Sequence, residues 1–85
     1  MQQRWLQPTV TGQASDEPLR RLTERELEVF QLIAQGFTSA QIAKRINRSV
    51  KSVEAYRTAI RAKLGAKSTL DLARLALAYF PSARR

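Results

Sequence analysis

The sequence predicts a small all-α domain built from four helices. Three observations support this fold class. Four segments start with a Thr or Ser in the position of a helix N-cap, the apolar residues that follow recur at helical spacing, and no segment shows the alternation of a strand. With 85 residues, of which 44% are hydrophobic, the chain can form one small domain with a thin core.

The first helix is predicted to follow Thr23, in the stretch LTEREL. Thr23 and Glu26 have the spacing of a capping box, in which each side chain accepts the backbone N–H of the other residue. Phe30 and Ile33 belong to an apolar stripe at helical spacing. Gly36 is expected to end this helix.

Two further helices are predicted in the middle of the chain. The first follows Thr38, whose capping-box partner is Gln41, and continues to about Ile46. The second is capped by Ser49 and runs to Leu64, where a glycine follows. The short connection between these two helices is the layout of a helix-turn-helix.

The last helix is predicted to follow Ser68, with Asp71 at its third position, and to end before Pro81. The domain is therefore placed at residues 22–80, and residues 81–85 are assigned to a C-terminal tail.

Residues 1–21 are predicted to be a flexible linker or disordered tail. They show no helical or strand period and contain Pro8, Gly12 and Pro18, which interrupt regular structure. The fold class is thus a four-helix domain with a flexible N-terminal tail.

The composition argues against an enzyme or a metal protein. The chain has no cysteine and no histidine, so the commonest nucleophiles, general bases and metal ligands are absent. No cofactor is expected. No apolar run approaches the roughly 18–20 residues that span a bilayer, and the N-terminus lacks the pattern of a signal peptide. The protein is therefore expected to be soluble and intracellular.

The positive charge of the chain is gathered in one region. The formal net charge is +8, and residues 38–67 hold eight cations against Glu54 alone. A cluster of charges of the same sign on two adjacent helices is typical of nucleic-acid binding. The eight cations are Lys44, Arg45, Arg48, Lys51, Arg57, Arg61, Lys63 and Lys67.

Helical geometry sorts the third helix into two faces. Val53, Ile60 and Leu64 fall on one side and are expected to point inward. The opposite side carries short residues, which would let the helix approach base edges in the major groove, although alanine is also simply the best helix former. This outer side holds Lys51, Ala55, Thr58 and Ala62, with Glu54 at its border.

Two charged residues of this helix have more than one interpretation. Glu54 can serve the helix dipole in the first turns, or it can accept a hydrogen bond from a cytosine amino group. Arg57 lies close to the inward stripe, so we expect it to reach Glu26 or Glu28 rather than DNA.

The segment from Leu22 to Leu77 resembles the LuxR/FixJ/GerE-type helix-turn-helix domain. The matching motifs are the opening LT-x-RE, Gly36 before the second helix, QIA within it, S-x-K-S-V-E entering the third helix, KLGAKS after it, and L-x-x-LAL in the fourth. The resemblance implies a bacterial transcription factor whose third helix is the recognition helix. Two positions depart from the usual pattern, because Tyr56 stands where many members have histidine and Ser52 replaces the usual threonine.

The resemblance places base readout on Glu54, Ala55 and Thr58. It places phosphate contacts on Thr38, Ser39, Lys51 and Tyr56, and the charge pattern adds Lys44, Arg48 and Arg61. Tyr56 is expected to be half-buried.

The fourth helix is expected to join two subunits. Its apolar residues cover more than half of its circumference, which is wider than the stripe that one small core needs. Leu72 and Ala76 are expected to face the subunit's own core. The predicted dimer contacts lie on two outer flanks, Leu75 with Tyr79 and Leu70 with Leu77. A twofold pair would bind an inverted-repeat operator on double-stranded DNA.

The biological setting stays open between several alternatives. The chain resembles the output domain of a two-component response regulator, with residues 1–21 as the linker to a receiver, but it also suits a free-standing regulator. RNA polymerase is a further candidate partner. The competing interpretations are a sigma-factor region of the same lineage and a basic helical module that binds an acidic protein.

Overall fold

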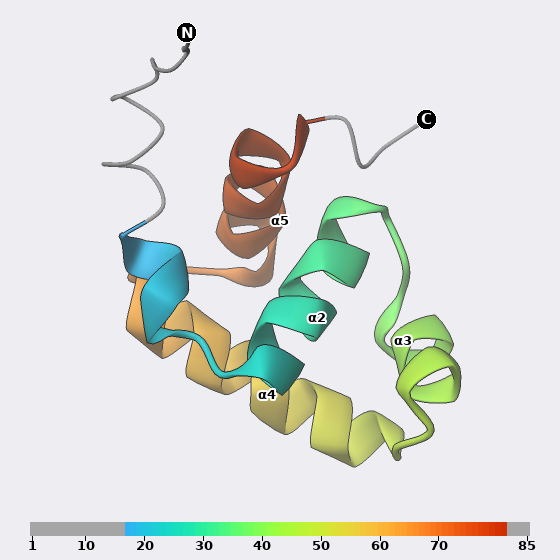
Figure 1. Cartoon of the computed structure of the whole chain (residues 1–85). Helices are drawn as coiled ribbons and strands as arrows, with labels where there is room; N and C mark the ends of the chain where they lie inside the picture. The colour runs from blue at the N-terminus through green and yellow to red at the C-terminus, as the bar shows by residue number, and fades with distance from the viewer. Residues whose placement is uncertain (1–16, 82–85) are drawn as a thin grey trace, which may run out of the picture.

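The computed structural model describes residues 17–81, which contain helices and no strand (Figure 1). The all-α fold class predicted from the sequence is therefore confirmed. The elements are a 3-10 helix η2 (Pro18–Arg21) and the α-helices α2 (Glu24–Ala34), α3 (Ser39–Ile46), α4 (Val50–Leu64) and α5 (Thr69–Tyr79). The predictions for residues 1–16 and 82–85 lie outside the described residues.

The helices α2 and α3 begin at the predicted capping boxes. The Thr23 Oγ1 accepts the N–H of Glu26 at 3.1 Å, and the Thr38 Oγ1 accepts the N–H of Gln41 at 3.2 Å. The reciprocal bonds are present as well, from the N–H of each threonine to the side chain of its partner. Both boxes are confirmed.

The two serine caps are also present, with one difference at α5. Ser49 accepts the N–H of Ser52, and Ser68 accepts the N–H of Asp71. The Asp71 carboxylate does not return a bond to the cap residue but accepts the N–H of Lys67 at 2.9 Å. It therefore fixes the connection that enters α5 as well as the first turn of the helix.

Left-handed residues end α3 and α4. Asn47, with φ of 58°, is the C-cap of α3, and Gly65, with φ of 73°, is the C-cap of α4. Asparagine tolerates this conformation better than most residues with a side chain, and glycine adopts it freely. These two positions turn the chain sharply, so that α4 starts directly after α3 and α5 folds back over the domain.

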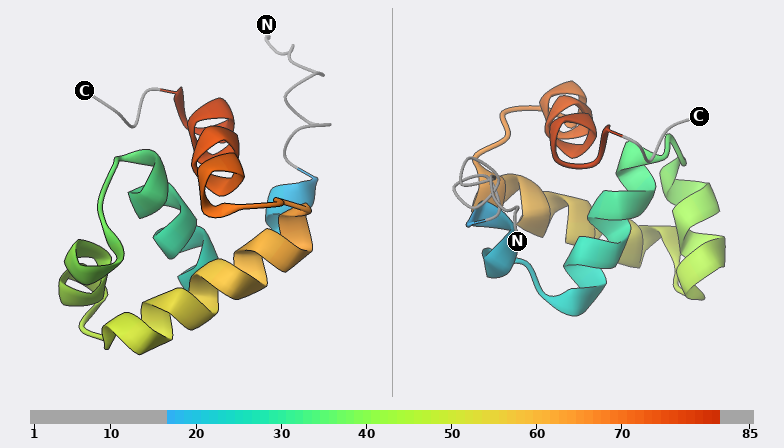
Figure 2. Two further views of the ribbon diagram at one scale, coloured as in Figure 1. Left: turned by 180° about the vertical axis from the view of Figure 1, so that it is seen from behind. Right: turned by 45° about the horizontal axis from the view of Figure 1, so that its top comes forward.

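The core lies between α2, α4 and α5, with α3 closing one end (Figures 1 and 2). In Figure 1 and in the left view of Figure 2, α4 runs along one edge of the molecule, with α3 beside its N-terminal end and η2 beside its C-terminal half. The largest fully buried side chains are Phe30, Ile42, Ile60, Leu72, Val29 and Val53.

Residues 18–21 differ from the predicted linker. They form η2, whose Leu19 packs against the core, and the N–H of Leu22 donates to the carbonyl of Leu19 at 3.1 Å. Pro18 presets the backbone for a helical turn, and Leu19 and Leu22 place two apolar side chains one turn apart. These four residues are thus ordered by tertiary packing on α4, which periodicity alone could not indicate.

Candidate nucleic-acid interface

The helix α4 separates a buried face from an exposed one. Val53 and Ile60 are fully buried, and Leu64 is half-buried against the core. The opposite face is solvent-exposed from the first turn to the last and carries Lys51, Glu54, Ala55, Thr58 and Ala62. The predicted inward and outward faces of this helix are confirmed.

The three predicted base-reading residues lie together on this exposed face. Glu54 and Ala55 are consecutive, and Thr58 follows Glu54 by one helical turn, so all three point away from the core. The Glu54 carboxylate is not free in solvent. Its Oε2 accepts a hydrogen bond from the Oγ of Ser39 at 2.5 Å.

The N-terminus of α3 lies beside this face. Thr38 is exposed, but its Oγ1 is occupied as the cap of α3, and Ser39 is half-buried and donates to Glu54. The first backbone N–H groups of a helix have no intrahelical acceptor, and the helix dipole is positive at this end. This helix end can therefore hold a phosphate through its main chain.

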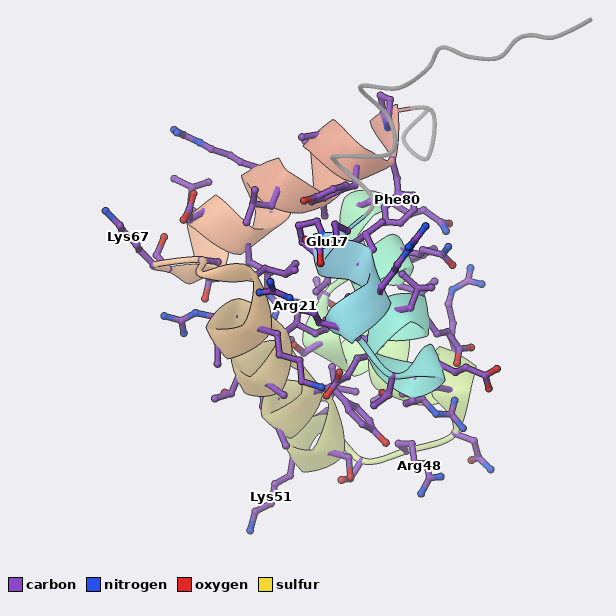
Figure 3. The ribbon with its side chains drawn as sticks, turned by 60° about the vertical axis from the view of Figure 1, so that its left-hand side comes forward. Glu17, Arg21, Arg48, Lys51, Lys67 and Phe80 are labelled. Atoms are coloured by element: carbon purple, nitrogen blue, oxygen red, sulfur yellow. The ribbon has the colours of Figure 1, made fainter. Side chains whose placement is uncertain are left out.

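Three predicted phosphate-binding cations are exposed around the turn between α3 and α4. They are Lys44, Arg48 and Lys51. Arg48 and Lys51 project from the end of the molecule where α3 meets α4, and Lys67 projects at the other end of α4 (Figure 3). None of these side chains forms an ion pair among residues 17–81.

Two other predicted phosphate residues have additional roles in the fold. Tyr56 is half-buried, as expected, and packs against the core. Arg61 donates from its Nη2 to the carbonyl of Lys67 at 3.1 Å, and its Nε is buried without a partner among the described residues. Arg61 therefore holds the connection between α4 and α5, a role that the sequence did not indicate.

The prediction that Arg57 reaches Glu26 or Glu28 is wrong. Arg57 does not pair with Glu26 or Glu28; instead the Nζ of Lys63 lies 2.7 Å from the Oε1 of Glu26. Arg25 pairs with Glu28 at 3.0 Å on the surface. The position at which α2 crosses α4 determines which cation lies near Glu26. The crossing brings the first turn of α2, with Glu26, close to the last turn of α4, with Lys63.

The pKa of Glu26 is lowered by this arrangement. Burial alone would raise it, but the hydrogen bonds from Lys63 and from the backbone N–H of Thr23, with the positive charge of Lys63, outweigh the burial. The carboxylate is therefore ionised at neutral pH and neutralises one cation of α4. This ion pair holds the Lys63 side chain on the side of α4 that faces α2.

Two features near the interface were not singled out from the sequence. Val50, the first residue of α4, is 46% exposed, so an apolar side chain stands between Arg48 and Lys51. On α3, the Arg45 guanidinium lies 4.1 Å over the ring of Phe37, where both residues border an open hollow of about 340 Å³ with Gln41 and Lys44. Val50 could have been found from its place in the first turn of the predicted third helix.

The predicted dimer residues of α5 divide into two groups. Leu75 and Tyr79 pack against the core, and the Tyr79 ring meets Phe30 edge-on at 6.0 Å. Leu70 is 64% exposed, whereas Leu77 is half-buried but lies outside the set of side chains that pack on the core. Of the two flanks, the one with Leu70 and Leu77 is therefore the less covered by the domain itself.

The described residues contain neither a candidate metal site nor a membrane helix. No cluster of three or more His, Cys, Asp or Glu side chains is found within residues 17–81. In the same range no helix has both the length and the apolar character needed to cross a membrane.

Comparison with known proteins identifies the family. The family model of bacterial regulatory proteins, luxR family (GerE), matches residues 20–76. The oxygen regulatory protein NreC of Staphylococcus aureus (strain MRSA252) is 46% identical over 67 residues, which are 79% of this chain and 30% of the relative. NreC of Staphylococcus carnosus (strain TM300) is 44% identical over 70 residues, 79% of this chain and 32% of the relative.

The chain spans roughly a third of the length of these curated relatives. No solved structure matches it. The family match covers more than half of the chain and includes every element described above from the end of η2 into α5. The chain therefore belongs to the luxR family of bacterial regulatory proteins, and residues 20–76 are its helix-turn-helix DNA-binding domain.

Proposed function

We propose that this chain is the DNA-binding output unit of a bacterial response regulator and that α4 reads bases in the major groove. The observation that carries the proposal is the exposed face of α4, where short side chains lie between cations. B-DNA's major groove admits an α-helix only when bulky side chains do not hold its backbone away. Ala55 and Ala62 leave that space, and Glu54 and Thr58 supply polar atoms.

Phosphate contacts orient this helix on the duplex. Lys44, Arg48 and Lys51 are exposed at the α3–α4 end, and the N-terminus of α3 offers main-chain donors beside them. Such contacts fix register and supply affinity without carrying sequence information. We assign the chain no catalytic activity and place it in the cytoplasm with its DNA.

A second copy of the chain completes the proposed complex. The Leu70 and Leu77 flank of α5 is the surface that suits a twofold contact, and a twofold pair would bind an inverted repeat. RNA polymerase remains a candidate partner of the bound dimer.

The salt dependence of binding tests the phosphate contacts. If Lys44, Arg48 and Lys51 each neutralise one phosphate, log K against log salt should have a slope of about −3 per domain. Lys51→Ala should weaken binding to every duplex similarly and bring the slope about 0.9 closer to zero. The matched control is Arg74→Ala, an exposed cation on α5, which should leave the slope unchanged.

Fluorescence anisotropy with random and selected duplexes measures both quantities. A slope near zero for the wild-type domain would remove nucleic acid as the partner. Equal effects of Lys51→Ala and Arg74→Ala would place the phosphate contacts elsewhere on the surface.

A further inference from the structure

One hydrogen bond joins two residues that the interface would otherwise use separately. The Oγ of Ser39, the first residue of α3, donates to the Oε2 of Glu54 in α4 at 2.5 Å. Among the described residues it is the single side-chain hydrogen bond between these two helices. It lies at the border of the exposed face of α4, where DNA would approach.

The bond limits what Ser39 can do for a phosphate. A serine hydroxyl has one proton, and here that proton is donated to a carboxylate. A phosphate oxygen can only accept, so the same hydroxyl cannot donate to it while the bond to Glu54 is made. A phosphate contact made by the Ser39 hydroxyl therefore conflicts with this hydrogen bond.

The same bond gives Glu54 a defined orientation. Glutamate has three rotatable side-chain bonds, and an exposed one loses rotamer freedom when it binds. Anchoring Oε2 to α3 restrains the carboxylate, while Oε1 has no hydrogen-bond partner among residues 17–81 and keeps its acceptor capacity. The acceptor is thus held ready for an amino group exposed in the major groove, as on cytosine N4.

We propose that Ser39 is a positioning residue that sets sequence preference through Glu54. The inference rests on the proposed function, since it requires that α4 reads bases. Ser39 fixes the Glu54 carboxylate against the first turn of α3 and thereby strengthens discrimination at the one base pair that Glu54 contacts. It contributes nothing to phosphate binding through its hydroxyl.

A double-mutant cycle tests this assignment. The variants are Ser39→Ala, Ser39→Thr, Glu54→Ala and the Ser39→Ala/Glu54→Ala pair, each measured on a selected duplex and on its single-base-pair substitutions. Ser39→Ala should lower the preference at one base pair by about two- to tenfold, the size expected for one lost hydrogen bond. Ser39→Thr keeps a hydroxyl and should restore the preference.

The remaining arms separate positioning from a phosphate contact. Glu54→Ala should lose the preference at the same base pair, and the double variant should match Glu54→Ala with no further loss. A phosphate ligand would behave differently, because Ser39→Ala would then weaken all duplexes equally and would do so in the Glu54→Ala background too. Circular dichroism melts confirm folding, which the intact Thr38 cap should preserve.

Failure of the inference and failure of the proposed function give different results. If the wild-type domain bound no duplex, the proposed function would fail. If Glu54→Ala changed one base preference and Ser39→Ala did not, the positioning role alone would be wrong. If neither variant changed any preference in a domain that binds specifically, Glu54 would not read a base and the inference would fall with it.

Discussion

Two threonines of this domain have opposite surroundings. Thr23 is the cap of α2, with its Oγ1 accepting the N–H of Glu26, whereas Thr58 stands on the exposed face of α4 with no hydrogen bond from its side chain among the described residues. The same substitution at the two positions should therefore affect different properties.

Thr23→Ala should lower the free energy of unfolding by about 0.5–2 kcal/mol, because the first turn of α2 loses its cap. It should leave the ranking of duplexes unchanged. Thr58→Ala should change that ranking and alter stability by less than about 0.5 kcal/mol, as is usual for an exposed position. Urea titration and competition binding with substituted duplexes measure the two properties. A changed ranking in Thr23→Ala without loss of stability would contradict the capping role.

At the residue scale the sequence predicted caps better than contacts. Thr23, Thr38, Ser49 and Ser68 were all identified correctly, because a cap and its helix lie within four residues of each other. The bond between Ser39 and Glu54 spans 15 positions and depends on how two helices cross, so no local pattern could reveal it.

At the scale of elements, one ion pair connects the beginning of α2 to the end of α4. Glu26 accepts from the N–H of Thr23 at 3.0 Å and from Lys63 at 2.7 Å through the same oxygen. Its side chain is 9% exposed and that of Lys63 is 35% exposed. The pair is therefore part of the structure that holds α4 on the domain, and its strength should depend on pH.

The pKa of Glu26 is below the ordinary value of 4.5 in the folded state, so its ionised form stabilises the fold. This contribution is complete above the unfolded pKa and is lost as the pH falls through the folded pKa. Wild-type stability should therefore decline from about pH 5 downward, and Glu26→Gln should show a shallower decline over the same range. Thermal or urea unfolding between pH 7 and pH 3 measures the difference.

The control is Glu28→Gln, since Glu28 pairs with Arg25 on the surface and carries half-exposed side-chain atoms. Its stability curve should run nearly parallel to that of the wild type. Parallel curves for Glu26→Gln as well would show that the buried pair has no part in acid unfolding.

The elements themselves were predicted nearly residue by residue, but their contacts were not. The periodicity that placed Val53 and Ile60 inside is local to α4. The choice of Lys63 instead of Arg57 as the partner of Glu26, and the docking of η2 on α4, depend on the angle between elements. Sequence patterns fix which face of a helix is buried and say little about which neighbour covers it.

At the scale of the whole molecule, the sequence left two flanks of α5 as candidate dimer contacts, and the fold distinguishes them. Leu75 and Tyr79 pack against the core, whereas Leu70 and Leu77 do not. An exposed apolar surface on a domain this small usually marks a contact. The dimer prediction therefore moves to the second flank.

Leu77→Asp should abolish cooperative binding to a duplex with two half-sites and leave binding to one half-site intact. The new carboxylate would be buried without a partner in the twofold contact, while in the monomer position 77 is partly exposed and lies outside the core. The matched variant is Leu75→Asp, which should instead lower the stability of the monomer by about 1–3 kcal/mol. Mobility-shift titrations with one and two half-sites, with melts of each variant, separate the outcomes. Wild-type cooperativity in Leu77→Asp would exclude this flank of α5.

The two faces of α4 have a consequence for how such a regulator changes over evolution. Val53 and Ile60 maintain the fold from one side of the helix, while Ala55 and Thr58 stand on the other and touch nothing in the core. If these positions read bases as proposed, a lineage can alter positions 55 and 58 one mutation at a time and acquire a new operator without first losing its stability. Glu54 is different, because its carboxylate is shared with Ser39. Positions 39 and 54 are expected to change together, and a graft that transfers one without the other should carry over an incomplete preference.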